Sequence, residues 1–246
     1  MIIGSNILRF EKLSSTNAHA AMLLKNGEVP EGTVICSAFQ TEGKGQTGNR
    51  WESEEGKNLL FSIILYPYSV NPEEQFLISI AVSLGICDFL DRMIKDSKIK
   101  WPNDIYFKDD KIAGILIENS LIGENLESCV AGIGLNINQE KFPDSISNPV
   151  SIKLATGKEY NTNDCLKLVL NDLDSRYKEL LYGDRVKLIN EYISRLYRLN
   201  ELNDFKTADT HFRGRITGIS GSGLLVIEKD NGTRNEFSFK EVDYVF

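Results

Sequence analysis

A glycine-rich stretch with two cations is the part of the sequence best suited to binding an anion. Residues 39–51 read FQTEGKGQTGNRW, in which three glycines are interspersed with polar side chains and with Lys44 and Arg50. Glycines allow backbone N–H groups to approach an anion closely, and the two cations add positive charge. Trp51 supplies one large apolar ring that could cover a bound ring system. The same composition is also typical of a flexible linker, so this stretch alone leaves both interpretations open.

A second cluster of polar and aromatic residues lies at 100–104, where the sequence is KWPND. It brings together a cation, an indole, an amide and a carboxylate. Pro102 has no backbone N–H to donate to a sheet, which favours a strand edge or a break in a strand. The predicted strand IAGILI follows at 112–117, after a turn at Asp109 and Asp110. A surface hairpin with a half-exposed tryptophan is the alternative interpretation.

Small and polar residues alternate with apolar ones in the strand predicted over 128–138. Alternate residues of a strand point to opposite faces. Glycine inside a strand weakens it and often marks a place where a ligand approaches the backbone, so we expect one face to be a ligand side. Its members are Gly132, Gly134, Asn136 and Asn138. The expected core side consists of Val130, Ile133, Leu135 and Ile137.

Two predicted strands, at 33–39 and 58–65, must hold the glycine-rich stretch. Both are rich in β-branched or aliphatic residues, and they leave 40–57 as the connecting loop. A loop of that length in a compact domain is usually functional or disordered. Before these strands, a hydroxyl and amide group at 14–17 begins a helix that Gly27 ends. That group is expected to cap the helix, and the same helix N-terminus could present donors to a polar ligand.

Three further helices and a small C-terminal unit complete the predicted elements. A mostly apolar helix is expected from Pro72 to about Ile94, and two amphipathic helices at 163–181 and 184–202. Residues 140–162 show no regular pattern. From about 205, short alternating segments predict four or five strands, with a hairpin at Asn231-Gly232. The predicted fold class is α+β with a small C-terminal barrel.

Composition and charge argue against several classes of protein. The chain has 246 residues, of which 41% are hydrophobic, so it can form one large domain or a main domain with a small one. A net charge of −7 argues against a nucleic-acid-binding surface, and no apolar run approaches a membrane span. Only two histidines are present, so no histidine triad or histidine-based zinc site is expected. The four scattered cysteines and an N-terminus unlike a secretion signal predict a reduced, cytoplasmic protein.

Five motifs in order and register resemble those of the biotin protein ligases. They are Ser15-Thr16-Asn17, Gln40 with 43–51, and the segments 100–104, 111–116 and 132–136. The C-terminal strands are similar to the SH3-like domain of that family. The resemblance implies a mixed, mainly antiparallel sheet packed with helices, of the class II aminoacyl-tRNA-synthetase-like type. It also implies a catalytic domain over 1–204, an SH3-like domain over 205–246, and the ligase-only form without a DNA-binding domain.

The reaction implied by this resemblance has two steps. The carboxylate of biotin attacks the α-phosphate of ATP and releases pyrophosphate, and a lysine of a biotin carboxyl carrier domain then displaces AMP from biotinyl-AMP. Cations and backbone amides must offset the repulsion between the two anionic substrates. ATP and biotin are the expected substrates, with Mg²⁺ bridging the phosphates. The expected partner is the carrier domain of a biotin-dependent carboxylase, without nucleic acid or membrane, and the protein is expected to be a monomer or a weak homodimer.

The resemblance also implies roles for individual residues. Lys111 matches the family's catalytic lysine, and Lys44 would assist it at the adenylate junction. The residues implied for biotin are Ser15, Thr16, Asn17, Gln40, Gly43, Lys44, Gly45, Gln46, Lys111, Gly114, Gly132 and Gly134. The residues implied for ATP or the adenylate are Gln46, Asn49, Arg50, Trp51, Asn58, Lys100, Asn103, Asp104 and Asn136. No protein ligand for a metal is implied.

The glycine-rich loop departs from the family pattern, which is often Gly-Arg-Gly-Arg-Arg-Gly-Arg. The four arginines are replaced here by Lys44, Gln46, Thr47 and Asn49. Lys44 keeps the charge without the bidentate fork of arginine, and the other three keep hydrogen bonding alone. The departure bears on phosphate affinity and on retention of the adenylate.

Two other functions remain open at this point. A lipoate or octanoate protein ligase shares the general fold, but the polar group formed by 15–17 and Gln40 favours a ureido ring over an acyl chain. A non-catalytic, ligand-sensing regulator is the second alternative, and the acidic net charge weighs against its DNA-binding form.

Overall fold

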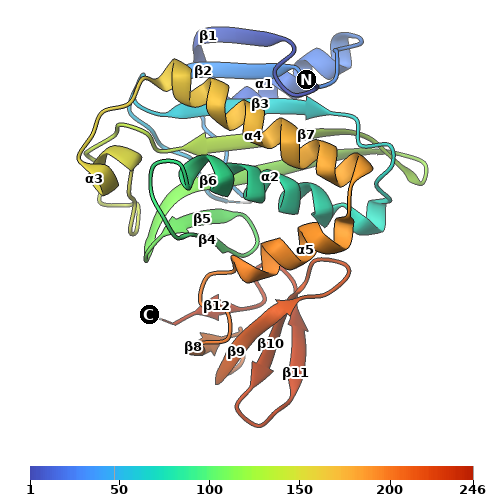
Figure 1. The fold of residues 1–246 in the computed structure, drawn as a ribbon, viewed down its shortest axis with the longest axis vertical. Coiled ribbons are helices and arrows are strands. Elements are labelled where there is room, and N and C mark those ends of the chain that lie inside the picture. Colours follow the sequence, from blue (N-terminus) through green and yellow to red (C-terminus); the bar gives the residue numbers. More distant parts are fainter. Residues whose placement is uncertain (47, 246) are drawn as a thin grey trace.

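A seven-stranded sheet forms the centre of the protein, whose computed structural model describes residues 1–46 and 48–245. The strand order is β1-β2-β3-β7-β6-β5-β4 (Figure 1). The strands are β1 (Ile7–Leu13), β2 (Val34–Gln40), β3 (Leu59–Leu65), β4 (Ser97–Lys100), β5 (Asp104–Phe107), β6 (Asp110–Ile122) and β7 (Asn125–Leu135). β1 and β2 pair in parallel, and the other neighbours pair antiparallel. The predicted mixed, mainly antiparallel sheet is confirmed.

Helices cover both faces of this sheet. α2 (Phe76–Leu90) and α4 (Thr162–Tyr182) pack together across one face (Figure 1), and α1 (Thr16–Asn26) packs against β2, β3 and β7. Ser15 caps α1 through its hydroxyl, which accepts a hydrogen bond from the backbone N–H of Ala18, and Gly27 ends the helix as predicted. The remaining helical segments are a 3₁₀ turn at Pro72–Glu74, α3 (Ile152–Thr156) and α5 (Arg185–Ser194).

Alternation along β7 places two different environments on its two faces. Ala131, Ile133 and Leu135 point into the core with α2 and α4. Val130 instead packs with Ala20, Ile35 and Ile64 on the α1 side. The prediction that Val130 lies on the core side was therefore wrong, because it shares its parity with the glycines at 132 and 134.

Two predicted helices end earlier than expected. The helix predicted over 184–202 ends at Ser194, because the backbone of Arg195 and Tyr197 turns to hydrogen-bond with Ile99 on β4. Arg198 and Asn200 then adopt left-handed backbone angles (φ 57° and 61°) that no α-helix contains. The long apolar helix is split into the 3₁₀ turn and α2, which ends at Leu90. The segment 140–162, expected to be irregular, contains the short helix α3.

The C-terminal strands form a second, five-stranded antiparallel sheet. It consists of β8 (Leu202–Lys206), β9 (His211–Ile219), β10 (Leu225–Lys229), β11 (Arg234–Phe237) and β12 (Asp243–Tyr244), in the order β11-β10-β9-β8-β12. The hairpin between β10 and β11 confirms the prediction from Asn231-Gly232, with Gly232 at φ 83°. Among the described residues no pairing joins β11 to β12, so hydrogen bonds do not close the sheet into the predicted barrel. The indole N–H of Trp101 donates to the backbone oxygen of Gly223 (2.9 Å) and ties this sheet to the first.

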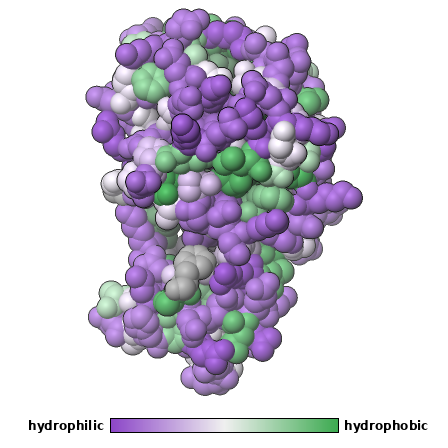
Figure 2. All heavy atoms as spheres, turned by 90° about the vertical axis from the view of Figure 1, so that its left-hand side faces the viewer, coloured by the Kyte–Doolittle hydropathy of each residue, from purple (hydrophilic) through white to green (hydrophobic). Residues whose placement is uncertain are grey.

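The face of the protein drawn in Figure 2 is mainly hydrophilic. On the face drawn in Figure 2, charged and polar residues predominate and apolar residues form smaller patches between them. Within residues 1–46 and 48–245, no helix is both long and apolar enough to cross a bilayer. The four cysteines are all unpaired, and burial raises the pKa of the Cys87 and Cys129 thiols to about 12. These thiols are therefore inert members of the core.

Candidate functional site

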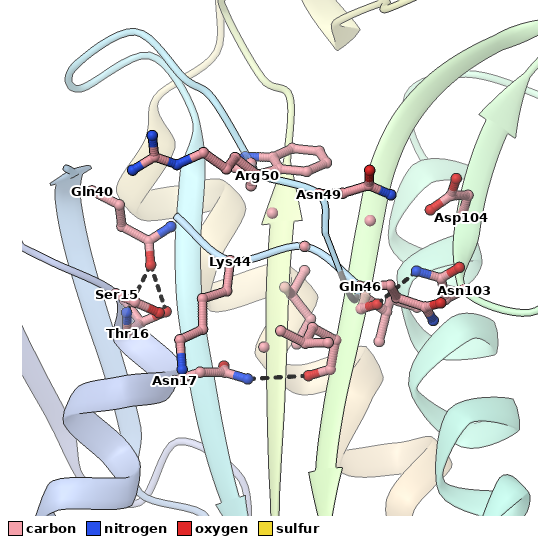
Figure 3. Close-up of a pocket in the computed structure, with 18 of the residues that line it drawn as sticks. Ser15, Thr16, Asn17, Gln40, Lys44, Gln46, Asn49, Arg50, Asn103 and Asp104 are labelled. Carbon is pink, nitrogen blue, oxygen red and sulfur yellow. Dashed lines mark hydrogen bonds between the residues drawn. The ribbon is translucent and has the colours of Figure 1, made fainter. Parts of the chain in front are cut away.

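A cavity of about 160 Å³ lies on the α1 face of the main sheet, beneath the glycine-rich loop. The N-terminus of α1, the loop between β2 and β3, and strands β6 and β7 supply most of its wall (Figure 3). Its lining residues are Ser15, Thr16, Asn17, Gln40, Lys44, Gly45, Gln46, Asn49, Arg50, Trp51, Asn103, Asp104, Lys111, Gly114, Ile115, Leu116, Gly132, Ile133, Gly134 and Phe239. Figure 3 shows two ends, with Thr16, Asn17 and Lys44 at one and Gln46, Asn103 and Asp104 at the other.

The first end is uncharged apart from Lys44 and is rich in hydrogen-bonding groups. Thr16 and Asn17 are buried at the start of α1. The side-chain oxygen of Gln40 accepts from the Thr16 backbone N–H (2.7 Å) and from the Thr16 hydroxyl (3.1 Å). The fully buried hydroxyl of Ser62, on β3, lies 2.7 Å from the Thr16 hydroxyl and 2.6 Å from the Asn17 amide oxygen. The arrangement can bind a compact polar group that carries both donors and acceptors.

The second end carries the ionic groups. The Lys111 ammonium lies 2.7 Å from a carboxylate oxygen of Asp104, and both side chains are partly exposed to solvent. The Asn103 side chain donates to the backbone oxygen of Ile115 (2.9 Å), and the backbone N–H of Ile115 donates to the backbone oxygen of Asn103. This pair of bonds fixes the segment after Pro102 against β6, so that Asp104 faces Lys111.

Trp51 lies between the two ends, over the glycines of β6 and β7. A Cβ atom at Gly134 would come within 2.3 Å of the indole, and one at Gly114 within 2.8 Å. A Cβ at Gly132 would come within 2.1 Å of the Asn17 amide oxygen. In this structure the glycines make room for Trp51 and Asn17, which occupy the space where the sequence predicts a ligand.

Most of the residues predicted for the site do line the cavity. The four that do not are Gly43, Asn58, Lys100 and Asn136. Gly43 lies in the wall of a neighbouring cavity that also contacts Gln40, Arg50 and Trp51. Thr47, one of the positions where the loop departs from the family pattern, lies outside the described residues.

The other three face the protein interior or the second sheet. Asn136 follows the last residue of β7, so the alternation that places Gly132 and Gly134 no longer applies, and its amide donates to the backbone oxygen of Val150 (3.0 Å). Asn58 donates to Gln139 and accepts from the backbone N–H of Ile137. The Lys100 ammonium donates to the Tyr106 hydroxyl (3.0 Å). The predicted position of these three side chains at the cavity is corrected accordingly.

Sequence reasoning missed several residues at the site. Leu116 and the neighbouring Glu118 share the parity of Gly114 on β6, so alternation could have identified them. Ser62 is a lone hydroxyl within the apolar run LLFSIIL, which signals a buried polar contact. Phe239 reaches the cavity from the turn after β11, and no local pattern predicts such a tertiary contact.

The cavity is suited to binding anions. Its described wall has three cations, Lys44, Arg50 and Lys111, and one carboxylate, Asp104. Within the described part of the chain, no three His, Cys, Asp or Glu side chains are grouped as a metal site would require.

The chain belongs to the biotin/lipoate A/B protein ligase family, which its residues 10–136 match. It is 30% identical over 245 residues to the bifunctional ligase/repressor BirA of Bacillus subtilis, covering 96% of this chain and 74% of that protein. It is 26% identical over 231 residues to the biotin–[acetyl-CoA-carboxylase] ligase of Paracoccus denitrificans, covering 90% of this chain and 93% of that protein. Among solved structures it resembles the biotin protein ligase of Aquifex aeolicus in complex with biotin and ATP, with a TM-score of 0.81, 26% identity, and coverage of 98% and 99% of the two chains.

Proposed function

We propose that this protein is an ATP-dependent biotin protein ligase that forms biotinyl-AMP and transfers biotin to a lysine of a biotin carboxyl carrier domain. One observation carries the proposal. A single cavity joins an end rich in hydrogen-bonding groups, suited to a ureido ring, to an end where Lys111 can meet a carboxylate and a phosphate, and Lys44 and Arg50 add positive charge from the loop. The names of the relatives from Paracoccus and Aquifex, and the presence of biotin and ATP in the latter's structure, support the same assignment.

In the first step, biotin lies with its ring at Thr16, Asn17 and Gln40 and its carboxylate toward Lys111. A carboxylate oxygen forms a bond to the α-phosphorus of ATP while the bond to the pyrophosphate oxygen breaks. Lys111 offsets the negative charge that accumulates between carboxylate and phosphate, and it exchanges its contact with Asp104 for the substrates. Lys44 and Arg50 add positive charge from the loop.

In the second step, the amine of the carrier lysine attacks the acyl carbon, and AMP leaves with the electrons of the acyl–phosphate bond. The amine must lose a proton, and the leaving phosphate of AMP stays bound to the cations of the site. Trp51 and the glycine-rich loop cover the adenylate and exclude water, which would otherwise hydrolyse it.

The remaining assignments follow from this function. Mg²⁺ would be held by the ATP phosphates, since the described cavity wall offers one carboxylate, Asp104. We also propose that the C-terminal sheet is an SH3-like unit, although β8 crosses the boundary predicted after residue 204. The carrier belongs to a biotin-dependent carboxylase, and the ligase acts in the cytoplasm as a monomer or a weak homodimer.

Adenylate formation with different acids tests the assignment. Purified protein, ATP and Mg²⁺ are incubated separately with biotin, lipoate and octanoate, and pyrophosphate release is measured. We expect release with biotin alone, because Thr16, Asn17 and Gln40 would be left unpaired by an acyl chain. Release with lipoate or octanoate but not biotin would assign the protein to the other branch of its family. Tight binding of biotin with no release in any mixture would favour the non-catalytic regulator.

A further inference from the structure

The side chain of Glu118 makes a contact at the biotin end of the site that none of the assigned roles uses. Glu118 lies on β6 beyond the cavity wall, and its carboxylate accepts a hydrogen bond from the Asn17 amide nitrogen at 2.7 Å. The same nitrogen also donates to the backbone oxygen of Leu116 at 3.3 Å. Both partners of the amide nitrogen are therefore acceptors, and one of them carries a negative charge.

These contacts fix which way the Asn17 amide faces. The two ends of an asparagine amide have nearly the same shape, so hydrogen-bond partners decide its orientation. The reverse orientation would place the amide oxygen against the Glu118 carboxylate and the Leu116 carbonyl, where it could only be repelled. In the observed orientation the oxygen instead lies 2.6 Å from the Ser62 hydroxyl.

The orientation of Asn17 also sets the direction of the hydrogen-bond chain behind the cavity. Ser62 has one proton, and it lies within reach of both Asn17 and Thr16. With the amide oxygen facing Ser62, that one proton can go to Asn17 instead of Thr16, and the Thr16 hydroxyl can then keep its lone pairs for the cavity. With the amide reversed, Ser62 would accept a hydrogen bond from the Asn17 amide nitrogen and donate its own proton to Thr16. Asn17 and Thr16 would then each lose a hydrogen-bond acceptor that faces the cavity.

We infer that Glu118 is a positioning residue that holds Asn17 and Thr16 as acceptors for the two N–H groups of a ring urea. The inference rests on the proposed function, which supplies the ligand. Glu118 does not line the cavity and is exposed on its other side, so it acts through Asn17. It is thereby a determinant of selectivity for a ligand with N–H donors over a ligand of similar shape without them.

The test compares Glu118→Gln with Glu127→Gln. Glu127 lies on the neighbouring strand β7, borders the same outer cavity as Glu118 and is also exposed, so it controls for loss of one negative charge. Affinities are measured by calorimetry for biotin and for its cyclic carbamate analogue, in which one ureido N–H is replaced by oxygen. Melting temperatures of all variants are recorded, and Glu118→Ala is included as a second variant.

We expect the wild-type protein to prefer biotin over the carbamate, because the carbamate leaves a buried acceptor unpaired. Glu118→Gln and Glu118→Ala should shrink this preference by roughly threefold to tenfold, the range of one net hydrogen bond. Glu127→Gln should leave it unchanged. A preference that stays the same in both Glu118 variants would overturn the inference while leaving the proposed function intact. Failure of the wild-type protein to bind biotin at all would instead overturn the proposed function.

Discussion

Lys111 is the residue on which the proposed chemistry depends most. Its ammonium lies beside Asp104 in a partly exposed ion pair, and ion pairs that solvent reaches add about 0–1 kcal/mol to stability. Lys111→Ala should therefore fold normally but form adenylate roughly a hundredfold more slowly or worse, because it loses transition-state charge stabilisation. Pyrophosphate release under single-turnover conditions measures the effect. Lys167→Ala, which removes a lysine from a surface ion pair on α4, is the control. Near-normal turnover in Lys111→Ala would contradict a catalytic role for this lysine.

Trp51 should contribute more to nucleotide binding than to biotin binding, because its ring is predicted to cover the adenine side of the bound nucleotide. Gly134→Ala would place a Cβ within 2.3 Å of that ring and displace it. We expect Trp51→Ala and Gly134→Ala each to weaken ATP binding by roughly tenfold, with a smaller effect on biotin. In the Trp51→Ala background, Gly134→Ala should add little, since the clash is gone. Gly221→Ala, in open space, is the control. Fully additive losses in the double variant would show that the two residues act independently.

Sequence reasoning identified site residues best where the chain is locally regular. The start of α1 and the even positions of β7 follow from capping and alternation, so Asn17, Gly132 and Gly134 were placed correctly at the cavity. Asn136 was misplaced because β7 ends one residue before it. Glu118 shares the parity of Gly114 on β6 but was overlooked, because its importance arises from a contact with Asn17, 101 residues away in the chain.

At the scale of elements, the glycine-rich loop is folded back on itself by its own backbone. The N–H of Gly45 donates to Asn49 and the N–H of Trp51 donates to Gly43. Ordering such a segment costs about 1–2 kcal/mol per residue, and the loop has few apolar anchors before Trp51. We expect 43–46 and 48–50 to exchange their amide hydrogens rapidly in the free protein and slowly with biotin and ATP bound. Equal exchange with and without ligands would contradict this account.

The cavity also has to widen when the ligands bind. Its volume is about 160 Å³, whereas pockets for ligands of this size hold roughly 300–1,000 Å³.

A second prediction at this scale concerns the N-terminal segment, which α4 holds through Asp174. Burial alone would raise the pKa of Asp174. Hydrogen bonds from Lys178 and from the backbone N–H groups of Ile3 and Ile2 outweigh burial and lower the pKa below its ordinary value. A lowered folded-state pKa gives stability that is present above the unfolded-state pKa and is lost as the pH falls through the folded-state value.

Asp174→Asn should therefore lower the urea midpoint at pH 7, and the difference from the wild-type protein should shrink as the pH falls through the acid range. Asp164→Asn, at an exposed site on the same helix, serves as the control. A difference that is independent of pH would mean that packing, and not the charge of Asp174, holds the segment.

The elements themselves were largely predictable from hydrophobic periodicity and turn residues. The strands at 33–39 and 58–65, the start and end of α1, and the Asn231-Gly232 hairpin are all set by local preferences. The end of α5 was not predictable in this way. Apolar residues continue at helical spacing through Leu196, while tertiary contacts with β4 and β9 bend the chain from Arg195 to Asn200.

At the scale of the whole molecule, the C-terminal sheet takes part in the site. Phe239 lines the cavity, and the bond from Trp101 to Gly223 holds the sheet against the segment that carries Asn103 and Asp104. Phe239→Ala should weaken ATP binding severalfold and change the melting temperature little, because the side chain is 41% exposed. Leu202→Ala, at 40% exposure on β8 of the C-terminal sheet, provides the control. Unchanged ATP affinity in Phe239→Ala would mean that the turn only borders the site.

The most direct test of the proposed function is mass spectrometry of a biotin carboxyl carrier domain incubated with this protein, ATP, Mg²⁺ and biotin. The account predicts that the carrier gains the mass of biotin less a water molecule at a single lysine. The gain should require ATP and disappear when that lysine is replaced by arginine. An unmodified carrier in the presence of folded, biotin-binding protein, or a carrier modified by lipoate or octanoate but not by biotin, would contradict it.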